Sequence, residues 1–230
     1  MKNLNRKLAF TLAEVLITLG IIGIVAALTL PMFLSNYQEK QFIPKIKKAY
    51  SMLAQGVTTS EVTNAAAEHW NYKLSAENFY NEYLKDYFIV NEKTTVGKAK
   101  TDGMIPYINM NGTTTDAVVA NDNSIILHIA DGCLVFISDE QNDKFKTMAI
   151  DINGNKKPNI VGKDLFLLAI QNPYGLTPYG FANGGKNTFG SKYEMDSLLE
   201  SKPDGCRNSG AYCLAYIMYN NWEMGNKYPR

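Results

Sequence analysis

The stretch Lys7-Leu-Ala-Phe-Thr-Leu-Ala-Glu-Val-Leu-Ile-Thr-Leu-Gly20 begins an apolar run from Phe10 to Leu30 in which Glu14 is the only ionisable side chain. At 1.5 Å per residue, a helix over this run is roughly 30 Å long, which matches the hydrocarbon core of a bilayer. Ionisable side chains inside a membrane helix are costly and rare. Glu14 therefore indicates a function beyond anchoring.

The leader before this run, residues 1–9, carries Lys2, Arg6 and Lys7 and no acid. A basic leader followed by an apolar stretch is typical of a secretory signal peptide, but this stretch is longer than a signal core and no small-x-small cleavage site follows it. The positive-inside rule places the leader in the cytoplasm and the long C-terminal part outside. A single-pass anchor explains this arrangement and leaves Glu14 unexplained.

The residues Lys7–Glu14 resemble the processing site of type IV prepilins and type II secretion pseudopilins, and the likeness continues through Gly23 and Pro31. The resemblance implies a prepilin peptidase that cuts between Ala9 and Phe10 and methylates the new amine of Phe10. Members of the family usually have glycine before the cut, so Ala9 departs from the pattern. Alanine is nevertheless a small residue, as glycine is.

The chemistry of Glu14 favours pairing between chains. Apolar helices gain little from meeting in lipid, whereas a buried carboxylate gains from a nearby cation. The predicted cation is the Phe10 amine of a neighbouring chain, because the two groups of one chain lie about 6 Å apart along the helix axis. Such a pair would set the axial register between subunits. The alternative interpretation is that Glu14 extends toward the lipid headgroups.

Gly23 and Pro31 are predicted sites of helix flexibility. Pro31 lacks an amide hydrogen and clashes with the preceding turn, which weakens the helix around it. The resemblance implies that this region can melt when subunits pack into a filament. The alternative is that glycine and proline are simply commoner in membrane helices.

The predicted organisation has three parts: a leader over 1–9, a helix over 10–60 that is transmembrane and then amphipathic, and an extracytoplasmic head over 61–230. The amphipathic half carries an apolar stripe at spacings of three and four residues, which consists of Phe42, Ile46, Tyr50, Leu53 and Val57. The fold class is α+β and pilin-like: a long N-terminal helix packed on a C-terminal antiparallel sheet.

Within the head, runs of β-branched and aromatic residues predict successive short strands, which favours an antiparallel meander. Asp131-Gly132 is a predicted hairpin turn. Ser75–Phe88 reads as a short helix with Ser75 as its N-cap, and the region around Thr94–Thr115 as a long surface loop. The predicted strands are Ser124–Ala130, Cys133–Ser138, Phe145–Ile152, Asp164–Ile170 and Tyr212–Met218.

The chain has three cysteines, Cys133, Cys206 and Cys213. An extracytoplasmic head permits disulfides, and the odd count leaves one thiol unpaired. A bond between Cys206 and Cys213 is favoured because they enclose a short turn-rich loop. Pairing of Cys133 with a C-terminal cysteine is the alternative.

The loop after Asp151 has oxygen-bearing side chains at alternate positions, Asp151, Asn153 and Asn155, as in calcium loops. It departs from the EF-hand pattern, because its glycine comes early and Gly162 stands where the last acidic ligand belongs. The alternative is a tight turn in which Asp and Asn bond their own backbone. Some pseudopilins bind calcium, so calcium is kept as a possible cofactor and no other is predicted.

No enzyme is predicted. His69 and His128 are the only histidines, and no catalytic or nucleotide-binding motif occurs. Loss of the three leader cations takes the net charge from +1 to −2, which gives no reason to expect nucleic acid as a partner of the head.

The predicted function is a structural subunit of a type IV pilus or a type II secretion pseudopilus. The precursor would cross the bacterial inner membrane once, with the head outside, and would then enter a periplasmic or cell-surface filament. Its partners would be other subunits, the membrane and, by resemblance, the prepilin peptidase, an assembly ATPase and a platform protein. The alternatives are a membrane-anchored binding or adhesion protein and a tip-located minor pilin.

Overall fold

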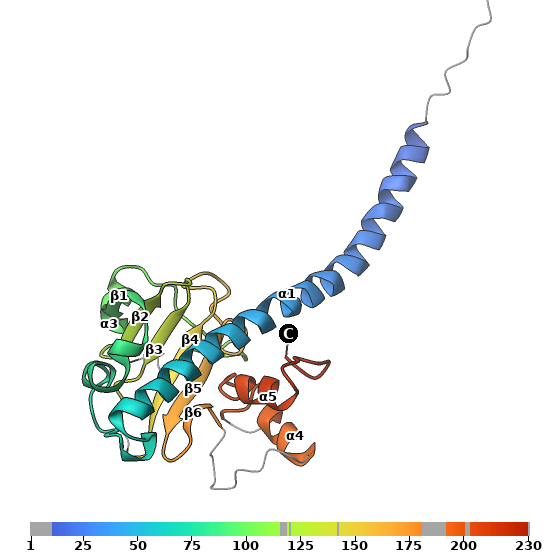
Figure 1. Ribbon diagram of the computed structural model, residues 1–230. Coiled ribbons are helices and arrows are strands. Elements are labelled where there is room, and N and C mark those ends of the chain that lie inside the picture. Colours follow the sequence, from blue (N-terminus) through green and yellow to red (C-terminus); the bar gives the residue numbers. More distant parts are fainter. Residues whose placement is uncertain are drawn as a thin grey trace, which may run out of the picture. The chain divides into compact units, whose positions relative to one another are not determined.

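The computed structural model describes residues 11–115, 119, 121–141, 143–180, 192–200 and 203–229, and for residues 31–40 and 192–194 it describes the backbone only (Figure 1). The predicted processing residues Ala9 and Phe10 therefore lie outside the described residues. The chain divides into two compact units, Met1–Gln41 and Phe42–Arg230.

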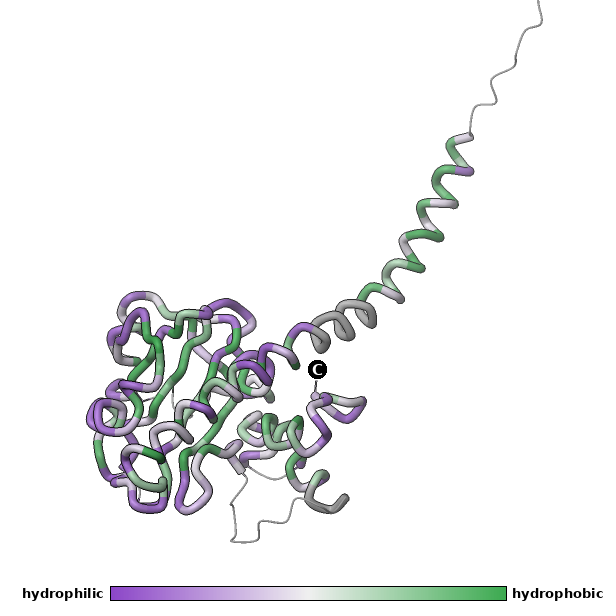
Figure 2. Tube along the Cα trace, in the orientation of Figure 1, coloured by the Kyte–Doolittle hydropathy of each residue, from purple (hydrophilic) through white to green (hydrophobic). Residues whose placement is uncertain are grey.

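The first unit contains the beginning of α1, a helix that extends from Leu12 to Asn64. Leu12–Leu30 is the one helical segment of the described residues that is long and apolar enough to cross a membrane, and none of it is buried. Figure 2 shows its apolar colouring. The backbone stays helical at Gly23 and Pro31, so their part in flexibility stays a prediction.

The second unit is built on a six-stranded antiparallel meander in which neighbours in sequence are neighbours in the sheet. Four of the five strands that we predicted are confirmed within one or two residues. The strands are β1 (Val90–Thr95), β2 (Ile125–Ile129), β3 (Leu134–Ile137), β4 (Phe145–Asp151), β5 (Leu165–Gln171) and β6 (Gly175–Pro178). The hairpin turn at Asp131-Gly132 joins β2 to β3.

Short helices surround this sheet. The predicted helix over Ser75–Phe88 is confirmed as three consecutive turns, and Ser75 caps it by accepting the Asn78 N–H at 3.3 Å. The short helices are η1 (Ala67–His69), α2 (Ala76–Phe79), the π-turn η2 (Tyr80–Leu84), η3 (Lys85–Tyr87), α3 (Val96–Thr101), α4 (Lys192–Glu200) and α5 (Cys213–Tyr219).

One face of the sheet, which we call the helix-covered face, packs against residues 42–64 of α1 (Figure 1). Ile46, Leu53 and Val57 of the predicted stripe are buried in one core with the strands. The Tyr50 hydroxyl donates to the Leu176 carbonyl of β6 at 3.2 Å. The α+β fold, with an N-terminal helix packed on an antiparallel sheet, is thereby confirmed.

Lys146 of β4 is fully buried on this face. Its ammonium donates to the carbonyls of Leu74 (2.7 Å) and Glu140 (2.9 Å) and lies 5.5 Å from the centre of the Phe79 ring. Burial lowers the pKa of Lys146. The side chain ties the loop before α2 to the sheet.

The opposite face, the loop-covered face, is defined by strand alternation, since successive side chains point to opposite sides. Phe136, Thr147, Asp151 and Leu167 share it by register. Tyr107, from the loop after α3, stacks edge-on against Phe136 and donates its hydroxyl to Asp151. Loops thus bury this second face, which is why β3, β4 and β5 are apolar almost throughout.

Two expectations for the head are wrong. Tyr212–Met218 is helical, because α5 covers Cys213–Tyr219. Its residues 213–217 are all buried, and a short segment buried on every side has no periodicity to separate helix from strand. The loop expected around Thr94–Thr115 instead begins with the end of β1 and with α3, whose N-cap is Thr95.

The predicted disulfide between Cys206 and Cys213 is confirmed. It closes the loop that leads into α5. Cys133 is a buried unpaired thiol, and burial raises its pKa to about 12. The alternative pairing of Cys133 with a C-terminal cysteine is therefore wrong.

Candidate functional site at the start of the long helix

Thr11 and Glu14 form a reciprocal set of hydrogen bonds at the first turn of α1. The Thr11 N–H and hydroxyl both donate to Glu14 Oε2 at 2.8 Å, and the Glu14 N–H donates to Thr11 Oγ1 at 3.2 Å. This is a capping box, in which two otherwise unpaired backbone donors are satisfied by side chains. It explains why the helix begins at Leu12.

The capping box gives Glu14 a structural contact that sequence reasoning missed. The signal was present, since Thr-x-x-Glu before an apolar run is the sequence signature of this cap. Glu14 is exposed, and within the described residues no cation pairs with it. The carboxylate thus caps its own helix while staying accessible to a group from outside the chain.

The comparisons with known proteins divide the chain where the apolar run ends, at Leu30. Residues 32–230 match the family described as "Family of unknown function (DUF6613)". The chain belongs to DUF6613. Residues 4–30 match the "Prokaryotic N-terminal methylation motif". No curated protein and no solved structure matches the chain.

The methylation motif confirms the resemblance to type IV prepilins and pseudopilins, and it covers Ala9, Phe10, Glu14 and Gly23. With the apolar helix Leu12–Leu30, it marks the DUF6613 protein as a membrane-anchored, pilin-like subunit. Proteins with this motif are generally structural and are processed by a prepilin peptidase before assembly. The cut between Ala9 and Phe10 itself stays a prediction.

Two of the three predicted calcium ligands, Asp151 and Asn155, accept hydrogen bonds from the protein's own donors. Asp151 accepts the Asn153 N–H at 2.9 Å and the Tyr107 hydroxyl. Asn155 Oδ1 accepts from the Ile105 N–H at 3.1 Å and from Asn159 at 2.8 Å. A calcium ion would have to displace these bonds, and no cluster of three or more His, Cys, Asp or Glu side chains occurs in the described part of the chain. Calcium binding stays a prediction.

The same loop brings two buried carboxyl groups close together, Asp151 and Asp164. Asp164 accepts the backbone N–H groups of Asn159 and Ile160, both at 2.7 Å. Burial is the main cause that raises the pKa of Asp151 to about 7; the Tyr107 hydrogen bond opposes it, and the charge of Asp164 adds to it. Burial also raises the pKa of Asp164.

The raised pKa of Asp151 predicts that the head loses stability as pH rises. An unfolded aspartate has a pKa of about 3.9, so between about pH 4 and pH 7 the folded state holds more protons than the unfolded state. The contribution of Asp151 to the free energy of unfolding is therefore full below pH 4. It is lost as pH rises through 7, at about 1 kcal/mol per pH unit. Urea unfolding in detergent, followed by tryptophan fluorescence from pH 5 to 8, measures the slope. Asp151→Asn should flatten it, and equal slopes in both proteins would contradict the assignment.

Proposed function

We propose that the DUF6613 protein is a structural subunit of a type IV pilus or a type II secretion pseudopilus. The observation that carries the proposal is the exposed apolar helical segment Leu12–Leu30, which lies within the methylation motif and has Glu14 as its only charge. Such a surface needs a cover, which lipid supplies before assembly and neighbouring helices supply after it.

The proposed pathway follows from the positive charges that precede the apolar helix. Lys2, Arg6 and Lys7 keep the leader in the cytoplasm, so the precursor crosses the inner membrane once with its head outside. After the cut before Phe10, the helix leaves the membrane and packs with others at the core of a filament. A prepilin peptidase, an assembly ATPase and a platform protein are the partners that the pilin resemblance implies.

Two other functions share the same N-terminal segment. A minor pilin at the filament tip would use the same processing and the same Glu14 contact. A membrane-anchored binding protein would not polymerise, and Glu14 would then serve only to cap its own helix. The head contains a pocket whose lining residues all lie outside this N-terminal segment.

The processing site supplies the experiment that tests this proposal. Protein purified from cells that carry the peptidase is expected to begin at Phe10 with a methylated amine, measured by N-terminal sequencing and intact mass. Ala9→Gly restores the residue usual in the family and should be processed as completely, whereas Ala9→Leu should accumulate as precursor. A mature chain that begins at Met1, or after Leu30, would exclude prepilin processing.

A further inference from the structure

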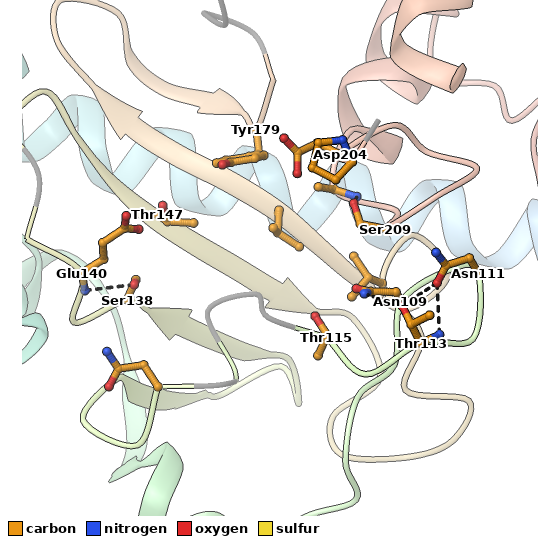
Figure 3. A pocket seen from close by; sticks show the side chains of 15 residues that line it. Asn109, Asn111, Thr113, Thr115, Ser138, Glu140, Thr147, Tyr179, Asp204 and Ser209 are labelled. Atoms are coloured by element: carbon orange, nitrogen blue, oxygen red, sulfur yellow. Dashed lines mark hydrogen bonds between the residues drawn. The ribbon is translucent and has the colours of Figure 1, made fainter. Parts of the chain in front are cut away.

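The loop-covered face of the sheet contains a pocket of about 610 Å³, a size usual for ligand sites. Its floor includes Ser138, Thr147 and Leu167, which lie on neighbouring strands or just beyond their ends. Figure 3 shows Glu140 beside Ser138 and Thr147, and Tyr179 beside Asp204. None of these residues lies in the N-terminal helix α1.

Hydrogen bonds between two loops fix the far wall of the pocket. The Met110 N–H donates to the Ser209 carbonyl at 3.2 Å, and the Asn111 N–H donates to the Asn208 carbonyl at 2.9 Å. Ser209 lies inside the loop that the Cys206–Cys213 disulfide closes. A wall held in this way loses little conformational freedom when a ligand binds.

Two of the asparagines that line this pocket use their side-chain oxygens in local hydrogen bonds. Asn111 Oδ1 accepts the N–H and the hydroxyl of Thr113 at 3.0 and 2.7 Å, and Asn121 Oδ1 accepts the Asn123 N–H at 2.9 Å. With their oxygens occupied by these local bonds, both residues have their NH₂ groups left to donate.

Two carboxylates supply the acceptors. Glu140 and Asp204 line the pocket, and no lysine, arginine or histidine is among the described residues that line it. Burial raises the pKa of Tyr179, and the charges of Asp204 and Glu140 add to this effect, so the Tyr179 hydroxyl stays protonated. The two carboxylates repel phosphates and other anions.

We propose that this pocket binds a neutral saccharide. A sugar hydroxyl both donates and accepts, which matches carboxylate acceptors and amide donors in one site. Its C–H faces match the apolar part of the lining, Val161, Leu167 and Ala211. A small cation would be attracted by the two carboxylates but would gain nothing from the amide donors. The inference does not depend on polymerisation of the chain.

Saccharide binding by the full-length protein tests the proposal, in a detergent without a sugar headgroup. The probes are maltose, lactose, cellobiose and N,N′-diacetylchitobiose, with spermidine and inorganic phosphate for comparison. Saturation-transfer NMR and calorimetry are expected to detect at least one disaccharide and neither comparison compound. Glu140→Gln and Asp204→Asn should each weaken its binding about tenfold, because hydrogen bonds to charged groups are the stronger ones.

Glu82→Gln is the matched control, since Glu82 is exposed on η2 and does not line the pocket. It should bind the disaccharide as the wild type does. Circular dichroism confirms that each variant is folded. The proposal is overturned if none of the four disaccharides binds, if spermidine binds in their place, or if binding is the same in wild type, Glu140→Gln and Asp204→Asn.

Discussion

Glu14→Gln is expected to abolish incorporation of the protein into filaments while leaving it inserted in the membrane. Glutamine can replace glutamate in a capping box, so the bonds to Thr11 that start the helix should persist. The substitution removes only the negative charge, and with it the proposed pair with the Phe10 amine of a neighbouring subunit. Sheared filaments and membrane fractions, probed for the head, measure the two outcomes separately.

Thr11→Val serves as the control for this prediction, because it removes the capping hydroxyl and keeps the charge. Filaments are expected from Thr11→Val and not from Glu14→Gln. Normal filaments from Glu14→Gln would show that the carboxylate only caps its own helix. The comparison thus separates the local function of Glu14 from its function between chains.

Gly210→Ala is expected to lower the free energy of unfolding by about 2–5 kcal/mol, a large fraction of the stability of an ordinary domain. Gly210 has a φ of +88°, which is strained for a residue with a side chain. A Cβ there would also lie 2.7 Å from the Val161 carbonyl carbon and overlap its oxygen. The Val161 N–H is bonded to the Ile108 carbonyl at 2.9 Å, so this backbone has little room to move.

Gly103→Ala separates the cost of backbone strain from the cost of contact with neighbouring atoms. Gly103 has a similar φ of +93°, but a Cβ there would have no atom within 4 Å. Its expected loss is about 1 kcal/mol, from backbone strain alone. Urea unfolding of both variants in the same detergent gives the difference. Equal losses would mean that contact with Val161 costs nothing.

The central strands could be predicted from the sequence because most of their side chains are apolar and form the core. β2 to β5 are short apolar runs separated by turn residues such as Asp131-Gly132, and their burial confirms that pattern. The edge strands lacked this signal. β1, Val90–Thr95, is mostly exposed and carries Glu92 and Lys93, and β6 is a four-residue strand that ends at Pro178. Pairing with a neighbour, more than intrinsic preference, makes these segments strands.

The two candidate sites also differ in how far the sequence reveals them. The processing motif and Glu14 are contiguous in sequence, so a single chain displays them. The pocket joins Glu140, Thr147 and Asp204 from distant parts of the chain. Each residue alone reads as an ordinary surface or strand residue, and only the register of the sheet and the closed cysteine loop bring them to one place.

Residues 42–64 of α1 and the pocket lie on opposite faces of the sheet. In a filament whose subunits meet through residues 42–64, every head would present its pocket on the face away from that contact. When one pocket of such a filament has bound a target, the neighbouring pockets are held close to the same target. Their effective concentration for it is therefore raised. A pocket with modest affinity for one sugar would then give the whole filament high avidity for a glycan-coated surface.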